Sequence, residues 1–321
     1  MSSSRSAAAA SDARRLRSLA PSLQAQLDAL IAHTDHTARR EDDPVSFAHR
    51  YSDPDDREVV ALVAALLAFG NVKAIRASVA RVLDALGASP ARAIETAPET
   101  ELAARLDGFV HRVYLGSDVA RVLAGAASLR RTHGTLAHAL EVLAAPQTDE
   151  PSVEERASAA DASNLASRGA SRAPLLRSLA AFGDALRGPA PHRRGLVHLV
   201  PDVRRGSACK RLLLFYRWMC RPADGVDLGL SRFPTSALVI PLDTHIHRIA
   251  RNLGLTRRAD ASLRTALEIT DALARFDAVD PVRYDFALCH LGVSRACPSR
   301  RDPARCSACV LRGVCRHWRR G

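Results

Sequence analysis

Helical periodicity is the feature that most limits what this chain can fold into. Apolar residues recur at a spacing of three to four along most of the sequence, whereas the alternation typical of half-buried strands is nearly absent. Only 4% of the residues are aromatic, too few for a β-rich core. The pattern predicts an all-α protein, with helices at Leu23–Ala32, Asp56–Ala68, Val72–Leu86, Asp118–Thr132, Thr135–Leu143, Ser207–Cys220, Thr244–Asn252, Ser262–Phe276 and Pro281–Leu291.

Composition along the chain predicts its domain organisation. A chain of 321 residues can form two ordinary domains or one large helical body with two lobes. Residues 1–20 lack apolar periodicity and are expected to form a disordered basic tail, and the Ala- and Ser-rich stretch 144–175 a flexible insertion. We expect 21–143 to form one helical lobe, and part of 190–321 to complete the other. The remaining divisions are 176–295, which is helical, and 296–321, a cysteine-rich basic tail.

The charge balance indicates the class of partner. There are 46 Lys and Arg residues against 34 Asp and Glu, a formal net charge of +12, which favours nucleic acid as the partner. The longest apolar run, Val59 to Phe69, is too short to cross a bilayer, and the N-terminal residues do not resemble a secretory signal. We therefore expect a cytoplasmic protein that binds no membrane and acts as a monomer.

Seven cysteines divide into two groups. Cys209, Cys220 and Cys289 are scattered through apolar segments and are expected to be buried thiols. Four others are separated by eight, two and five residues near the C-terminus: Cys297, Cys306, Cys309 and Cys315. Four clustered thiolates can hold either an iron–sulfur cluster or structural zinc, and spacing alone does not choose between them. Eight arginines against the single acid Asp302 would present this loop to a DNA backbone.

The cysteine spacing, with the preceding segment Leu288-Cys289-His290-Leu291-Gly292, resembles the C-terminal cluster loop of endonuclease III-like proteins. In that family the first gap usually holds six residues, so the loop is longer here. The resemblance implies a 4Fe–4S cluster rather than zinc.

The segment from Pro241 to Arg251 has the pattern of a helix start, with Asp243 at the N-cap. Capping alone would explain this aspartate. The sequence Leu-Asp-Thr-His followed by an Arg-rich helix also resembles the signature of the helix-hairpin-helix superfamily of base-excision DNA glycosylases. That resemblance implies that Asp243 is catalytic. His245 and His247 lie about 200° apart on a helix, so they cannot share a metal ion, and we expect either to contact a phosphate.

An upstream segment, Leu199 to Lys210, resembles the hairpin of the same superfamily, although Asp202 and Arg204 replace its two glycines. The resemblance implies a turn whose backbone amides hold a phosphate, with DNA contacts from Arg204, Arg205, Gly206 and Ser207. Residues 58–71 resemble the first core helix and the polar turn after it. In that turn Asn71 and Lys73 are candidate DNA contacts, although an ordinary helix connection explains them equally well.

Lysine is rare here: only Lys73 and Lys210 interrupt a wholly arginine-based set of cations, which hints at chemistry that a guanidinium cannot perform. Bifunctional members of the superfamily carry a nucleophilic lysine at the position of Gly206. Lys210 lies four residues later, on the same face of the expected helix, and its amine would fill that space and form a Schiff base. Without it, Asp243 and water would act alone.

Together these resemblances imply a two-lobed DNA glycosylase, with or without AP lyase activity, that removes a damaged or mismatched base from duplex DNA. The alternative is a non-catalytic DNA-binding module whose C-terminal loop is stabilised by iron–sulfur or zinc.

Overall fold

The computed structural model describes residues 23–146 and 172–319, and these residues are mostly helical, as the periodicity predicts. Residues 23–33 form the first helical segment. The α-helices after it are α2 (His36–Asp42), α3 (Pro54–Leu67), α4 (Val72–Leu86), α5 (Pro90–Thr96), α6 (Glu99–Arg105), α7 (Gly116–His133), α8 (Leu136–Val142), α10 (Ala173–Arg187), α11 (Arg194–Leu199), α12 (Lys210–Cys220), α13 (Thr244–Leu253), α14 (Leu263–Ala274), α15 (Asp285–Val293), α16 (Pro303–Ser307) and α17 (Arg316–Arg319). Short 3-10 turns are η1 (Pro44–Arg50), η3 (Val203–Arg205), η4 (Thr235–Ala237) and η5 (Val310–Gly313).

Two buried helices form the centre of the molecule. Every residue of α3 from Val59 to Leu67 is buried, so the longest apolar run of the sequence is a core helix. Helix α12 packs against α3 and is itself buried on nearly all sides. A helix that is apolar all round needs neighbours on every face, and the other elements supply them.

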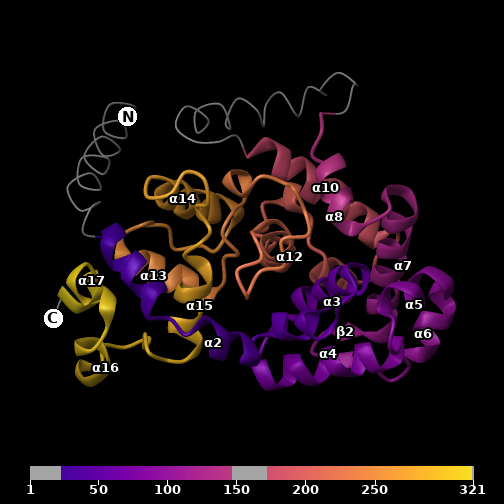
Figure 1. Cartoon of the computed structure of the whole chain (residues 1–321), viewed down its shortest axis with the longest axis horizontal. Helices are drawn as coiled ribbons and strands as arrows, with labels where there is room; N and C mark the ends of the chain where they lie inside the picture. Colours follow the sequence, from indigo (N-terminus) through magenta and orange to yellow (C-terminus); the bar gives the residue numbers. More distant parts are fainter. Residues whose placement is uncertain (1–22, 147–171, 320–321) are drawn as a thin grey trace.

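Those neighbours are arranged around the central pair (Figure 1). Helices α4 and α5 pack on α3, and α7 packs on α5, α6 and α10. On the other side of α12, α13 packs on α15 and the C-terminal helices α16 and α17 follow. The early helix α2 lies beside α15, where the His36 and Phe286 rings stack with centroids 5.5 Å apart. Segments from near the two ends of the described chain therefore share one region.

A small hairpin is the exception to the all-α pattern. Strands β1 (Val110–His111) and β2 (Tyr114–Leu115) pair antiparallel, with Val110 opposite Leu115 and His111 opposite Tyr114. Arg112 in its turn has φ of 56°. Strands of two residues are too short to show alternation, so the sequence pattern could not reveal them.

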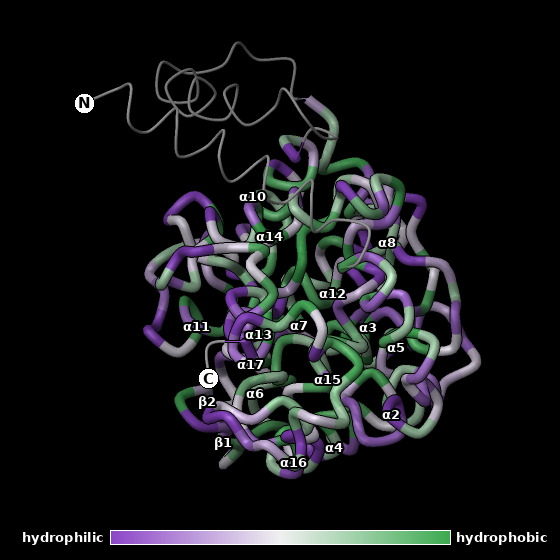
Figure 2. Tube along the Cα trace, turned by 90° about the vertical axis from the view of Figure 1, so that its left-hand side faces the viewer, coloured by the Kyte–Doolittle hydropathy of each residue, from purple (hydrophilic) through white to green (hydrophobic). Residues whose placement is uncertain are grey.

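The domain boundaries expected from composition fall partly outside the described residues. The tail 1–20 lies outside them, and so does most of the segment 144–175. Helix α10 already begins at Ala173, inside the expected insertion. Figure 2 shows hydrophobic segments within the helical body and hydrophilic ones at α13, α16 and α17. Within 23–146 and 172–319, no helix combines the length and apolarity needed to cross a bilayer.

Candidate functional site

Asp243 forms the start of α13, as the sequence predicts. Its carboxylate Oδ1 accepts hydrogen bonds from the backbone amides of His245 and Ile246, at 2.9 and 2.8 Å. The second oxygen, Oδ2, lies 3.8 Å from the Cys289 thiol, which donates to it from α15. Asp243 is half-buried. One oxygen therefore caps the helix while the other faces a neighbouring helix, so capping does not use the whole carboxylate.

The structure brings Lys210 and Asp243 into the same region, although they are 33 residues apart in sequence. Both act electrostatically on Cys289: burial raises the pKa of this thiol well above its usual value, Asp243 and Asp285 raise it further, and Lys210 lowers it. Asp243 and Lys210 also act on Asp285: its pKa is raised mainly by burial, Asp243 raises it further, and Lys210 lowers it. A carboxylate and an amine thus converge at the N-terminal ends of α13 and α12, against α15.

Asp285 links this region to the core. Its carboxylate is 3.2 Å from the Arg217 guanidinium, which also binds Asp227 at 3.1 Å, and all three side chains are buried. Burial raises the pKa of Asp285 to about 6, against the opposing effects of Arg217 and Lys210, and Asp243 raises it too. Charged groups inside a protein are retained only when paired, and this network pairs them.

Lys210 is the first residue of α12, and this corrects the sequence-based helix, which began at Ser207. Gly206 and Cys209 both have left-handed backbones, with φ of 77° and 44°, and Ser207 pairs with Ser262 in an isolated bridge. Because the segment before Lys210 is not helical, Lys210 does not share a helical face with Gly206, contrary to the prediction from the sequence. Instead Lys210 Nζ donates to the carbonyl of Ala68 at the end of α3, at 3.2 Å.

The hairpin residues lie at the surface, in the turn before α12. Arg204, Arg205 and Gly206 are exposed and Ser207 is half-buried. Arg204 is already bound to two carboxylates, Asp202 at 2.8 Å and Asp184 at 2.7 Å. Asp202 thus has a structural role in this turn, because its Oδ1 also accepts the Arg204 backbone amide.

Asn71 and Lys73 lie at the start of α4, both exposed. Asn71 caps this helix: its Oδ1 accepts the backbone amides of Lys73 and Ala74, at 2.9 and 3.4 Å. The turn that carries them follows Ala68, the residue that Lys210 contacts. The ordinary structural explanation of Asn71 therefore holds, and a DNA contact by Asn71 or Lys73 stays a prediction.

The two histidines of α13 contact different elements. His245 packs on α15, where a Cβ at Gly292 would lie 2.6 Å from the Cβ of His245. His247 Nε2 lies 3.0 Å from the carbonyl of Arg258, in the connection to α14. The two imidazoles therefore face different elements, as expected from their spacing, and His247 lines a surface pocket.

The four C-terminal cysteines occupy one loop packed on α13. Burial raises the pKa of Cys297, Arg248 lowers it, and Cys309, Cys315 and Cys306 raise it, which places all four thiols in mutual electrostatic range. Arg248 also donates to the carbonyl of Cys297, at 2.7 Å. Among the residues described, no three His, Cys, Asp or Glu side chains are gathered closely enough to hold one metal ion. The donor set itself, four thiols on one loop, fits either an iron–sulfur cluster or zinc.

Sequence reasoning missed the charged groups around Asp243. Besides Asp285 and Arg217, these include His290, whose Nε2 lies 3.2 Å from the carboxylate of Asp43. Asp43 in turn raises the pKa of Cys289. A signal was present, because an arginine and an aspartate inside strongly apolar helices are unusual unless paired. The sequence alone does not say with what they pair.

Comparison with known proteins places the chain in a family. No curated protein and no solved structure shows significant similarity to it. The model of a family described as a protein of unknown function (DUF2400) matches residues 43–294. This match covers more than half of the chain, begins at Asp43, includes Lys210 and Asp243, and ends before Cys297. The chain therefore belongs to the DUF2400 family.

Proposed function

We propose that this protein is a DNA N-glycosylase of the helix-hairpin-helix type that removes a damaged or mismatched base from duplex DNA. The observation that carries the proposal is that Asp243 Oδ2 contacts the Cys289 thiol at 3.8 Å, while Lys210 lies near enough to act on the same thiol and on Asp285. In this proposal the helices around α3 and those around α13 form the two lobes of a glycosylase fold, with DNA bound across the ends of α12 and α13.

Cleavage of a base–sugar bond can use both a carboxylate, such as Asp243, and an amine, such as Lys210. Cleavage of a base–sugar bond builds positive charge on the deoxyribose, and a fixed carboxylate such as Asp243 stabilises that state. The hydrogen bonds of Oδ1 to two helix amides hold the carboxylate in place. The positive ends of α12 and α13 favour a phosphate beside them.

Lys210 supplies the nucleophile in this scheme. Its nitrogen attacks the sugar C1′, the C1′–N bond breaks, and the base leaves with the electron pair, while Asp243 accepts the proton that the attacking nitrogen loses. The C1′–O4′ bond then breaks as the nitrogen lone pair forms the C1′=N bond, and O4′ takes the proton held by Asp243. The resulting iminium permits β-elimination of the 3′ phosphate. Cys289 is not an alternative nucleophile, because its raised pKa keeps it a thiol at neutral pH.

A 4Fe–4S cluster is part of the proposal, held by Cys297, Cys306, Cys309 and Cys315, with zinc as the alternative. When bound, the cluster would serve as a structural crosslink of the loop and would leave the chemistry to Asp243 and Lys210.

The test is base release from duplexes that carry single lesions, measured in single turnover. Asp243→Asn keeps the helix cap and removes only the charge, so we expect the rate to fall by at least about 100-fold. Borohydride should trap a covalent complex with the wild type and none with Lys210→Arg, which keeps the charge but cannot form an imine. Base release without a trapped complex would indicate a monofunctional glycosylase, in which Asp243 and water act without Lys210. Release of no base from any duplex, with unchanged DNA binding by Asp243→Asn, would instead support a non-catalytic DNA-binding module.

A further inference from the structure

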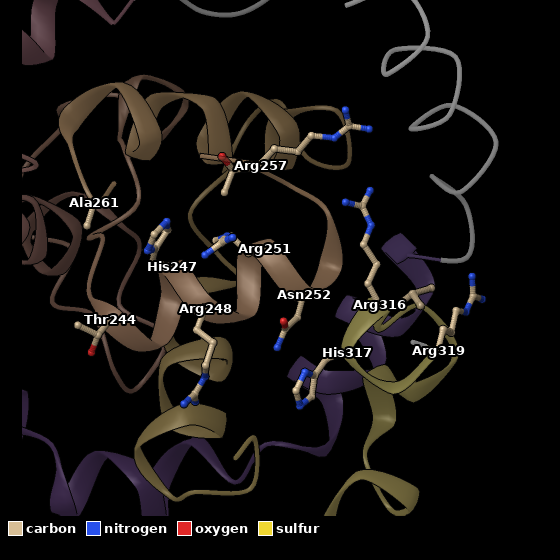
Figure 3. Close-up of a pocket in the computed structure, with 12 residues that line it drawn as sticks. Thr244, His247, Arg248, Arg251, Asn252, Arg257, Ala261, Arg316, His317 and Arg319 are labelled. Atoms are coloured by element: carbon tan, nitrogen blue, oxygen red, sulfur yellow. The ribbon is translucent and has the colours of Figure 1, made fainter. Parts of the chain in front are cut away.

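A strongly basic pocket lies on the outer face of α13, away from the core. Its volume is about 740 Å³. Five arginines and two histidines contribute to its lining, and none of the described residues that line it is acidic: the full lining is Thr244, His247, Arg248, Arg251, Asn252, Thr256, Arg257, Ala261, Val314, Arg316, His317 and Arg319. Figure 3 shows these side chains arriving from α13, from the connection to α14 and from α17. Such a pocket attracts an anion larger than one phosphate.

One wall of the pocket is a single stripe of α13. Thr244, His247, Arg248, Arg251 and Asn252 follow each other at helical spacing, opposite the buried stripe that faces the core. From Thr244 to Asn252 the helix rises about 12 Å. This length is enough to contact more than one phosphate of a nucleic-acid strand, whose phosphates follow each other at about 3.4 Å of rise along the duplex axis.

The opposite wall is held against α13 by specific contacts. The Arg316 guanidinium lies directly against Gly254, the C-cap of α13, whose φ of 79° favours glycine. Arg319 donates to the carbonyl of Gly313. Two lining side chains carry buried nitrogens for which the described part of the chain offers no hydrogen-bond partner, Arg248 Nε and His317 Nε2. Arg316 and Arg319 thus have defined contacts, and two lining nitrogens remain for a ligand.

The lining also indicates which anion fits. It contains no Trp, Tyr or Phe within the described residues, so a nucleobase would find no aromatic ring to stack on. It offers guanidinium, imidazole, amide and hydroxyl groups, the partners of phosphate oxygens. The first lining residue, Thr244, directly follows Asp243.

We infer that this pocket binds the phosphodiester backbone of a nucleic-acid strand and extends the DNA site from Asp243 along α13 to α17. The inference rests on the proposed function only in taking DNA as the polymer, and it does not require base release.

The experiment measures the binding of a short duplex without a lesion by fluorescence anisotropy, over a range of salt concentrations. The test variant is Arg251→Gln with Arg257→Gln. The matched control is Arg92→Gln with Arg131→Gln, which removes the same charge from exposed sites on α5 and α7. We expect the test variant to bind about tenfold more weakly. Its slope of log K against log salt should be shallower by about 1.8, the value for two lost phosphate contacts. The control should match the wild type.

Equal affinity and equal slope in the test variant and the control would overturn the inference. So would binding of inorganic tripolyphosphate, or of vesicles of an anionic lipid, that the test variant loses while it keeps full DNA affinity. If the wild type releases no base but the slope changes as expected, the proposed function fails and the pocket assignment stands. If base release proceeds normally and the slope does not change, only the pocket assignment fails.

Discussion

At the scale of single residues, the most informative group is Asp285. It is the first residue of the apolar helix α15 and lies buried between the Arg217 guanidinium and the region of Asp243 and Lys210. The sequence identifies Asp243 because a helix start has a recognisable pattern, but Asp285 has no such pattern around it. Its role depends on α12, α13 and α15 meeting in space, and side-chain periodicity does not predict that meeting.

Asp285 should make stability depend on pH. Its pKa of about 6 in the folded protein lies above the value of about 3.9 in an unfolded chain, so the folded state binds the proton more tightly. Its contribution to stability is therefore largest below pH about 4 and is lost as pH rises to about 6. We expect the free energy of unfolding of the wild type, relative to Asp285→Asn, to fall by about 2–3 kcal/mol across this window.

Urea unfolding of both proteins at a series of pH values measures this difference. Asp107→Asn, at an exposed position, is the matched control for the loss of one carboxylate. The assignment is contradicted if the free energy of unfolding of the wild type minus that of Asp285→Asn stays constant with pH or increases as pH rises.

At the scale of elements, the sequence predicts the long amphipathic helices well and their junctions poorly. Helix α13 was expected at Thr244–Asn252 and spans Thr244–Leu253, because Asp243 and Gly254 are strong cap signals. Helix α12 was expected from Ser207 but begins at Lys210, since a left-handed Cys209 and the bridge from Ser207 to Ser262 hold the preceding residues outside the helix. The bridge between Ser207 and Ser262 outweighs the local helix propensity of these residues. Lys210, the proposed nucleophile, is therefore the first residue of α12.

The junction of α13 with α15 should tolerate no added volume at Gly292. A Cβ there would lie 2.6 Å from the His245 Cβ, and backbone-anchored atoms cannot simply rotate away. We expect Gly292→Ala to destabilise the protein by about 1–3 kcal/mol, as overpacking does. Val293→Ala, at the next and exposed position of α15, should stay within about 0.5 kcal/mol of the wild type. Denaturant midpoints of the two variants check this, and equal midpoints would show that α15 shifts without cost.

At the scale of the whole molecule, an all-α fold follows from periodicity, whereas the composition of the candidate site does not. Asp43, Lys210, Asp243 and Asp285 come from four separated segments, and their meeting depends on packing around the buried pair α3 and α12. Sequence alone supplied two of the four, through resemblance to a family signature. Asp43 was missed because it precedes a 3-10 turn that has no apolar periodicity.

The cysteine loop lies outside the residues that match the family model, yet it touches the site through α13. If a cluster holds this loop, replacing Cys297, Cys306, Cys309 and Cys315 by serine should abolish bound iron and sulfide. Replacing Cys209 and Cys220, two buried core thiols, by alanine should leave bound iron and sulfide at wild-type levels. Elemental analysis of anaerobically purified protein measures this. Stoichiometric zinc without sulfide in the wild type would show that the loop holds zinc and not an iron–sulfur cluster.

The same four-serine variant connects the loop to DNA binding. Arg316 and Arg319 lie within four residues after Cys315, so a loop no longer held by metal would lose the α17 wall of the basic pocket while Asp243 and Lys210 stay in place. We therefore expect a shallower salt dependence of DNA binding, by about 0.9 for each lost phosphate contact, and limited proteolysis within 297–319. Metal loss with an unchanged salt slope and no new cleavage would mean that the contacts of Arg248 and Gly254 with the loop are sufficient to hold it.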